Sequence, residues 1–171
     1  MDQSSHPYRI VVVCWGNICR SPMAEFILRQ QIEDAGLGDR VVVSSAGTST
    51  EELGRPLDPR TIAVMERNAV RDSGFRAKRA IQFRSESFED SDLVLAADHV
   101  HDRILRERAR FPRDREKIHL LRSFDPAAVE AGTLGMDDPW YGADDDFDLT
   151  YAEIVAAAPG IIHHVRAQLD D

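Results

Sequence analysis

The stretch Val11-Val12-Val13-Cys14-Trp15-Gly16-Asn17-Ile18-Cys19-Arg20-Ser21-Pro22 decides how the rest of this chain is interpreted. A β-branched run ends at a cysteine, and an arginine follows after a five-residue gap. Ser21 suits a helix N-cap and Pro22 suits the first helical position. The stretch therefore predicts a strand, a tight loop and a helix start. Such a loop directs amides and a helix N-terminus into one concavity, which favours an anion.

The residue types in this loop match the chemistry of a phosphate ester. Positive partial charges would stabilise a Cys14 thiolate, and the planar fork of Arg20 can bind two phosphate oxygens. We expect Gly16 to adopt torsions that a Cβ would forbid, and Asn17 to tolerate the left-handed region. Taken one at a time, these residues favour a simpler interpretation, a buried core cysteine at a strand end and a solvent-facing arginine. The spacing Cys-x5-Arg-Ser-Pro after an apolar strand favours the phosphate site.

The length favours a single domain over residues 1–171, and the composition is that of an ordinary soluble globular protein, which is expected to be monomeric. The net charge of −9 argues against a nucleic-acid partner, because no basic field would attract phosphates. The two cysteines, Cys14 and Cys19, both lie in the loop, which argues against a disulfide scaffold and a structural zinc site. No metal or cofactor is expected. Residues 1–9 lack an apolar signal region, and no stretch is long enough to span a membrane, so a cytoplasmic location is expected.

Hydrophobic patterning predicts strands that alternate with helices. The expected strands are 8–13, 40–45, 92–96 and 117–121. The expected helices follow the Cys14 loop as far as a stop at Gly36, begin at Asp58-Pro59, cover 100–110 and begin again within 144–146. Residues 122–141 are expected to be largely irregular, and Pro159-Gly160 should kink or divide the last helix. This order indicates an α/β, doubly wound domain with a central parallel four-stranded sheet flanked by helices. Ligands bind such sheets at the carboxyl ends of the strands.

A late segment, Asp137-Asp138-Pro139-Trp140-Tyr141-Gly142, offers a carboxylic acid on a proline-stiffened loop beside two aromatic side chains. Alone it is typical of an ordinary Asp-Pro turn. Beside the Cys14 loop it predicts a proton donor for a leaving oxygen and a slot for a flat ring. The histidine pairs His99/His101 and His163/His164 lack further ligands at suitable spacing. The acidic run 144–148 is expected to be a helix start and no metal site.

Over nearly its full length the chain resembles the low-molecular-weight protein tyrosine phosphatase family. The resemblance rests on residues 14–22, on Ser45-Ala46-Gly47-Thr48 and on Asp138-Pro139-Trp140-Tyr141; Leu121-Arg122-Ser123-Phe124-Asp125-Pro126 resembles the actinobacterial branch. It implies hydrolysis of phosphotyrosine in protein substrates. It further implies that Cys14 forms a phosphocysteine, Arg20 binds the phosphoryl oxygens, and Asp138 is general acid and then base. The implied phosphate-loop residues are Trp15, Gly16, Asn17 (which holds the loop shape), Ile18, Cys19 and Ser21 (which hydrogen-bonds the thiolate).

Two positions depart from the family pattern. Glu51 stands where members often carry an aromatic side chain that walls the substrate slot formed with Trp140 and Tyr141. Lys78 stands near the place of a histidine that supports the loop asparagine. Both departures leave the chemistry intact and bear on substrate preference.

Other functions remain possible at this point. A related protein arginine phosphatase resembles this chain but has threonine in place of Ile18. Arsenate reduction would need downstream cysteines, and none follows Cys19. A non-catalytic phosphate-binding module would not need both Cys14 and Asp138. Across the tight loop, Cys14 and Cys19 are also expected to pair when Cys14 is oxidised, which predicts a redox-sensitive enzyme.

Overall fold

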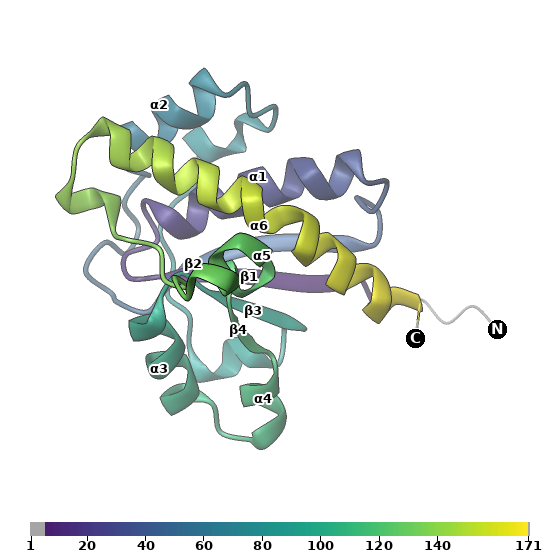
Figure 1. The fold of residues 1–171 in the computed structure, drawn as a ribbon. Coiled ribbons are helices and arrows are strands. Elements are labelled where there is room, and N and C mark those ends of the chain that lie inside the picture. Colours follow the sequence, from purple (N-terminus) through teal and green to yellow (C-terminus); the bar gives the residue numbers. More distant parts are fainter. Residues whose placement is uncertain (1–5, 171) are drawn as a thin grey trace.

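Parallel strands form the centre of the computed structural model, which describes residues 6–170; residues 1–5 and 171, at the ends of the expected 1–171 domain, lie outside the described residues. The strands are β1 (Tyr8–Cys14), β2 (Val41–Gly47), β3 (Leu93–Ala96) and β4 (Ile118–Leu120). Their order is β2-β1-β3-β4, and every pairing is parallel (Figure 1). The chain moves from β1 to one side and later to the other. The carboxyl end of β1 is therefore the point where ligands bind in such sheets.

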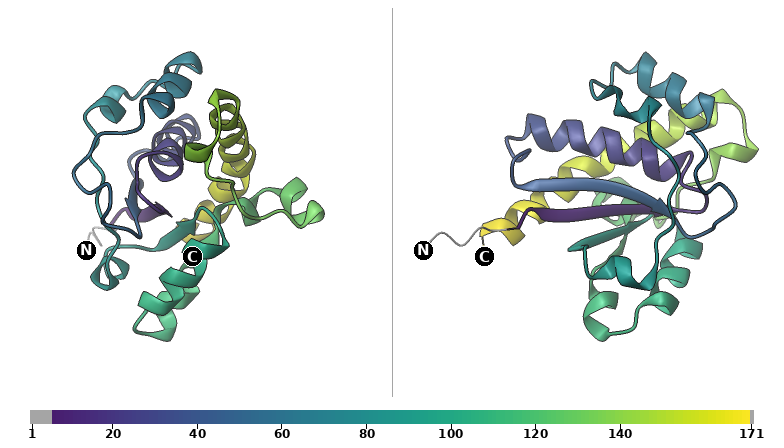
Figure 2. Two further views of the ribbon diagram at one scale, coloured as in Figure 1. Left: turned by 90° about the vertical axis from the view of Figure 1, so that its left-hand side faces the viewer. Right: turned by 180° about the vertical axis from the view of Figure 1, so that it is seen from behind.

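Helices cover both faces of the sheet, which confirms the doubly wound α/β prediction. The α-helices are α1 (Arg20–Asp34), α2 (Pro59–Arg67), α3 (His99–Arg108), α4 (Pro112–Glu116), α5 (Pro126–Ala131) and α6 (Asp144–Asp170). The 3-10 helices are η1 (Ser73–Arg76), η2 (Ser85–Phe88), η3 (Leu121–Phe124) and η4 (Pro139–Tyr141). Helices α1, α2 and α6 lie on one side, and α3 and α4 on the other (Figures 1 and 2). None of the helices within residues 6–170 is long and apolar enough to cross a membrane.

The two layers of helices bury separate apolar clusters against the sheet. Phe26 of α1 and Ile161 of α6 belong to the larger cluster. Leu105 of α3 and Phe83, which precedes η2, belong to the smaller one. The strands β1 and β3 contribute to both clusters, because their alternate side chains point to opposite faces. Burial on both faces explains their continuous apolar sequence.

Helix boundaries follow the expected signals in two places. Asp58 caps α2, since its Oδ1 accepts a hydrogen bond of 2.9 Å from the Arg60 amide. Gly36 follows the C-cap of α1 with φ of +76°, as expected of a glycine stop. The prediction that Ser21 caps α1 is wrong, because the helix already begins at Arg20 and the Ser21 hydroxyl bonds to the loop instead.

Residues 122–141 are more regular than predicted. Helix α5 lies within them, and its short length explains why the sequence pattern missed it. The Asp125 side chain caps it by accepting a hydrogen bond from the Ala127 amide. Gly132 ends it with φ of +70°.

Pro159 does not divide α6, which continues from Asp144 to Asp170. Its missing amide removes one hydrogen bond of the helix, while buried side chains on both sides of it keep the segment in place. The adjacent Gly160 has a packing role, because a Cβ there would lie 2.1 Å from the carbonyl oxygen of Phe124 in η3. The Pro-Gly pair therefore marks where η3 packs against the helix.

Substituting Gly160 should test this contact. Alanine normally stabilises a helix by about 1 kcal/mol relative to glycine. Here we expect Gly160→Ala to lower the free energy of unfolding by about 1–3 kcal/mol, because the methyl group overpacks against backbone. Urea denaturation measures the change. Gly38→Ala is the control, since a Cβ there meets no atom closer than 3.7 Å. A Gly160→Ala protein as stable as the parent would contradict the proposed packing role.

Candidate active site

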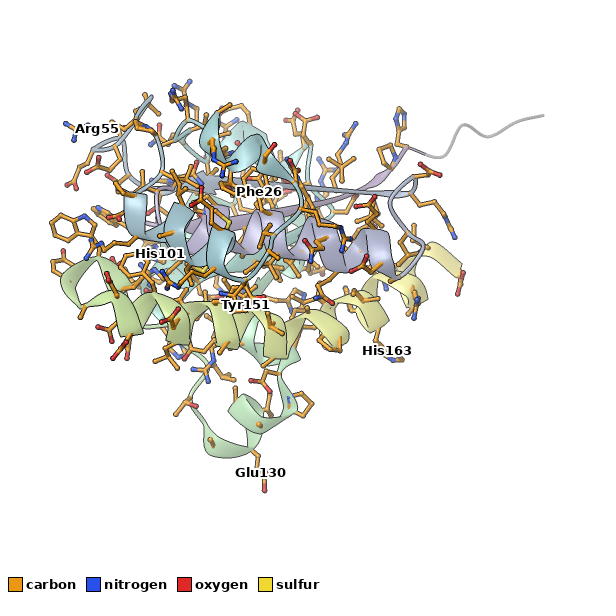
Figure 3. All side chains as sticks on the ribbon, turned by 90° about the horizontal axis from the view of Figure 1, so that it is seen from above. Phe26, Arg55, His101, Glu130, Tyr151 and His163 are labelled. Atoms are coloured by element: carbon orange, nitrogen blue, oxygen red, sulfur yellow. The ribbon has the colours of Figure 1, made fainter. Side chains whose placement is uncertain are left out.

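A pocket of about 130 Å³ opens at the carboxyl end of β1. The residues that line it come from the Cys14 loop, the segment after β2 and the late acidic loop: Cys14, Trp15, Gly16, Ile18, Cys19, Arg20, Glu51, Glu52, Asp138, Trp140 and Tyr141. Asn17 and Ser21 are fully buried and do not line it. Figure 3 shows Arg55 and His101 toward the same end of the molecule, and His163 toward the other. The structure thus brings the candidate phosphate loop, acid and slot together.

The buried Asn17 side chain holds the loop through hydrogen bonds. It has φ of +59°, in the left-handed region that the sequence led us to expect. Its Nδ2 donates hydrogen bonds of 2.9 Å to Ser21 Oγ and to Ser45 Oγ, and its Oδ1 accepts one of 3.0 Å from the Ile81 amide. One side chain therefore links the loop to α1, β2 and the segment after η1.

Gly16 serves the loop differently from the prediction. Its φ is not positive, so the expectation of torsions forbidden to other residues is wrong. A Cβ at Gly16 would lie 3.0 Å from Glu52 Cγ. The glycine therefore provides space for the neighbouring segment.

The segment Ser45-Ala46-Gly47-Thr48 supports the start of the loop through backbone hydrogen bonds. The Thr48 amide donates to the Cys14 carbonyl at 2.8 Å, and the Ser49 amide donates to the Trp15 carbonyl at 2.9 Å. A Cβ on Gly47 would lie 2.6 Å from Trp15 O. Only glycine allows this approach, which explains its place in the segment.

The two cysteines have different surroundings. Cys14 is the last residue of β1, and its Sγ lies 3.0 Å from Ser21 Oγ. The Ser21 hydroxyl accepts from Asn17 and also lies 3.2 Å from Ala46 O, so it has one hydrogen to donate to either the carbonyl or the sulfur. Burial raises the pKa of the Cys19 thiol well above its usual range, with nearby Asp58 and Cys14 adding to the effect. Cys19 therefore stays protonated at neutral pH.

Arg20 is buried, with a side chain that is 3% exposed, and both of its terminal nitrogens have partners. Its Nη1 donates to Asp98 Oδ2 at 2.6 Å and to the Met136 carbonyl at 2.9 Å. Its Nη2 lies 3.2 Å from His101 Nε2 and 3.3 Å from Asp138 Oδ2. The guanidinium thus joins α1, the start of α3 and the acidic loop.

The charges around this guanidinium reinforce one another. Burial by itself would lower the pKa of Arg20, but Cys14, Asp138 and Asp98 together raise it. Burial would likewise raise the pKa of Asp98, whereas hydrogen bonds and charge from His101 and Arg20 hold it well below its usual range. Arg20 and Asp98 are therefore both charged at any pH near neutrality.

Sequence reasoning missed Asp98 and His101 as parts of the site. The histidine was considered only as a metal ligand, and within residues 6–170 no group of three or more His, Cys, Asp or Glu side chains is placed to hold a metal ion. Asp98 also caps α3 by accepting from the Val100 and His101 amides. A polar residue just beyond the carboxyl end of a buried strand was the available signal for Asp98.

A buried ion network lies behind the loop. The Glu25 carboxylate pairs with Arg29 at 2.5 Å and with Lys78 at 3.1 Å, and it accepts a hydrogen bond from the Ser45 hydroxyl. Lys78 Nζ also donates to the Ser45 carbonyl at 3.1 Å. Because Ser45 also accepts from Asn17, Lys78 reaches the loop asparagine through one intervening residue. Two cations compensate the buried carboxylate.

The rim of the pocket is aromatic and acidic. Glu51 Oε2 accepts a hydrogen bond of 3.1 Å from Trp15 Nε1, and Glu52 pairs with Arg55 at 3.5 Å. Trp140 contacts Tyr141 edge-on, with ring centroids 4.9 Å apart. Tyr141 is 82% exposed, so Trp15 and Trp140 provide more of the enclosed aromatic surface. Glu51 lies at the pocket, where the sequence led us to expect it.

Comparisons with known proteins agree with this geometry. A family model described as low molecular weight phosphotyrosine protein phosphatase matches residues 9–170. The low molecular weight protein-tyrosine-phosphatase of Streptomyces coelicolor is 45% identical over 164 residues, covering 95% of this chain and 96% of that protein. Low molecular weight protein-tyrosine phosphatase A of Mycobacterium tuberculosis is 40% identical over 168 residues, covering 96% of each chain. The solved structure of Vibrio vulnificus Wzb in complex with benzylphosphonate is similar with a TM-score of 0.76 and 28% identity, covering 92% of this chain and 98% of that one.

Proposed function

The chain belongs to the low molecular weight phosphotyrosine protein phosphatase family and is an enzyme that hydrolyses phosphotyrosine; on this basis we propose that Cys14 is its nucleophile, Arg20 its phosphate ligand and Asp138 its general acid and base. One observation carries the assignment. The three side chains line the same pocket, with Arg20 in direct contact with Asp138. A nucleophile, an anion ligand and a proton donor within one pocket are what phosphoryl transfer through a covalent intermediate requires.

In the first step, the Cys14 thiolate attacks phosphorus and forms the S–P bond. The bond between phosphorus and the tyrosyl oxygen breaks, and Asp138 gives its proton to that oxygen. The Ser21 hydroxyl, 3.0 Å from Cys14 Sγ, supports the thiolate by donating to it. In the second step, Asp138 takes a proton from water, whose oxygen attacks phosphorus. The S–P bond breaks, inorganic phosphate leaves and Cys14 is restored as the thiolate.

Arg20 and the loop amides stabilise the charge on the transferring group. Charge in phosphoryl transfer is spread over three equatorial oxygens, which the planar fork of Arg20 and amides of the loop would complement. Asp98 and the Met136 carbonyl hold Nη1 of Arg20, which fixes the plane of the guanidinium before substrate binds. Such preorganisation avoids reorientation during the reaction.

Changing the acid tests its role. We expect Asp138→Asn to lower kcat for phosphotyrosine by roughly 10²- to 10⁴-fold, the usual contribution of a general acid. The loss should be smaller for 4-nitrophenyl phosphate, because its leaving group needs less protonation. Steady-state kinetics on both substrates measure this difference. Asp137→Asn is the matched control, and a larger, leaving-group-sensitive loss in that variant would mean that the wrong carboxylate was chosen.

We propose that the enzyme prefers phosphotyrosine in proteins to phosphoarginine. Ile18 lines the pocket together with Trp15 and Trp140, and this apolar lining suits a phenyl ring better than a guanidinium. Side-by-side turnover of phosphotyrosine and phosphoarginine peptides checks the preference, and equal kcat/KM values would contradict it. A monomeric state, a cytoplasmic location and the lack of a nucleic-acid partner stay predictions from the sequence.

Glu51 should influence how tightly the substrate ring and its flanking residues bind. We expect Glu51→Trp to lower KM for phosphotyrosine peptides by roughly 2- to 10-fold, in line with the value of an aromatic contact. The kcat should change little, because ground and transition states share this contact. With acidic peptides, KM should also depend less on salt, since the carboxylate no longer repels them.

Glu51→Gln separates the effect of the lost charge from that of an added aromatic contact. Glutamine removes the charge but keeps an oxygen that can accept a hydrogen bond from Trp15 Nε1. It should flatten the salt dependence without lowering KM for neutral peptides. If neither variant changes KM or the salt profile, residue 51 does not act on the substrate.

Oxidation should inactivate the enzyme reversibly through Cys14 and Cys19. Peroxide converts the Cys14 thiolate to a sulfenic acid, and the Cys19 thiol displaces water from it to form a disulfide. The raised pKa of Cys19 should make this second step slow, because the thiolate is the attacking form. Intact-mass measurement should find the loss of two hydrogens together with the loss of activity. Inactivation without this mass loss would exclude the pairing, and full recovery by thiol of peroxide-treated Cys19→Ser enzyme would show that reversibility does not require Cys19.

A further inference from the structure

The segment that carries Asp138 has no regular structure of its own between α5 and η4. Besides the direct contact of Asp138 with Arg20, hydrogen bonds of residues 135 and 136 hold this segment. The Met136 amide donates to the Ala97 carbonyl at 2.9 Å, and the Met136 carbonyl accepts from Arg20. The Gly135 carbonyl accepts a hydrogen bond of 2.9 Å from Arg122 Nη1. Two arginines therefore hold consecutive carbonyl groups just before the proposed acid.

Arg122 belongs to η3, within the segment Leu121-Arg122-Ser123-Phe124-Asp125-Pro126, to which the mechanism above gives no role. Its Nη1 also lies 3.3 Å from Glu153 Oε1 of α6, and both side chains are only 14% exposed. Its Nε is buried without a hydrogen-bond partner among residues 6–170. A guanidinium that is kept buried although one of its donors is unpaired points to a geometric role.

Glu153 depends on Arg122 in turn. Burial raises the pKa of the Glu153 carboxyl, Asp137 and Asp125 raise it further, and Arg122 opposes them. The close packing of Gly160 against the Phe124 carbonyl fixes η3 on the same helix. The guanidinium therefore bridges a rigid helix and the loop.

We propose that Arg122 and Glu153 are positioning residues that hold the 133–138 segment so that Asp138 can protonate the leaving oxygen. Glu153 orients the guanidinium from α6, and the guanidinium fixes the Gly135 carbonyl three residues before Asp138. The inference rests on the proposed role of Asp138. Because the pair touches neither the phosphate loop nor the pocket, its loss should affect proton transfer and leave phosphate binding intact.

Leaving-group dependence distinguishes this role from a purely structural one. We expect Arg122→Gln to lower kcat/KM for phenyl phosphate by roughly 10-fold, since misplacement of a catalytic group by a fraction of an ångström is costly. The loss for 4-nitrophenyl phosphate should be much smaller, and the inhibition constant of inorganic phosphate should not change. Glu153→Gln should produce the same selective loss. In the double variant, kcat/KM for phenyl phosphate should fall by less than the product of the two single fold-losses, because the two residues act as a unit.

Two further variants complete the experiment. Arg122→Lys, which can reach one partner, should recover part of the lost phenyl phosphate activity. Arg67→Gln breaks an exposed ion pair between α2 and α6, in which Arg67 Nη2 lies 2.7 Å from Asp148 Oδ1. It should change kcat/KM for neither substrate. If Arg122→Gln fails to fold, Glu153→Gln and Arg122→Lys provide the same comparison.

The outcomes separate the two proposals. Equal losses on both substrates, or no loss, in folded Arg122 and Glu153 variants would overturn the positioning role, provided that Asp138→Asn has its leaving-group-sensitive effect. If Asp138→Asn itself lacks that effect, the assignment of the acid is wrong and the positioning inference is overturned with it.

Discussion

The buried guanidinium of Arg20 is the constraint on which the rest of the site depends. A buried cation needs paired anions and filled hydrogen bonds, and Asp98, Asp138 and the Met136 carbonyl provide them. These groups lie on segments that are far apart in the sequence. Their convergence on one side chain requires the β2-β1-β3-β4 strand order, which places the ends of β1 and β3 side by side. The strand order that defines the fold therefore also brings together the partners of the buried guanidinium.

One set of polar contacts holds the loop of the proposed nucleophile, and a second set holds the segment that carries the proposed acid. Behind the nucleophile, Asn17 is fixed by Ser21 and Ser45, and Ser45 in turn by the Glu25 carboxylate and Lys78. Behind the acid, Arg20 and Arg122 hold successive carbonyl groups. The reacting side chains thus lie on loops, and their geometry comes from buried contacts with helices, as rigid catalytic sites require.

Local spacing made much of this predictable. The Cys14-to-Arg20 loop, the helix stop at Gly36, the cap at Asp58 and the alternation of strands and helices each follow from neighbouring residues. The misses depend on partners distant in sequence. Ser21 bonds to the loop and does not cap the helix. Gly16 leaves space for the Glu52 side chain. Asp98 and His101 contact Arg20, which lies some eighty positions earlier in the sequence. Pro159 stays within α6 because tertiary packing outweighs a local helix-breaking signal, which sequence periodicity cannot register.

The covalent role of Cys14 is the central claim, and trapping the intermediate tests it most directly. In Asp138→Asn enzyme, 4-nitrophenyl phosphate should still phosphorylate the nucleophile, while the missing base slows attack by water. Acid quenching during turnover, followed by peptide mass spectrometry, should find a phosphoryl group on Cys14 and none after further substitution of Cys14 by serine. A phosphoryl group on another residue, or continued turnover by Cys14→Ser enzyme, would contradict the mechanism.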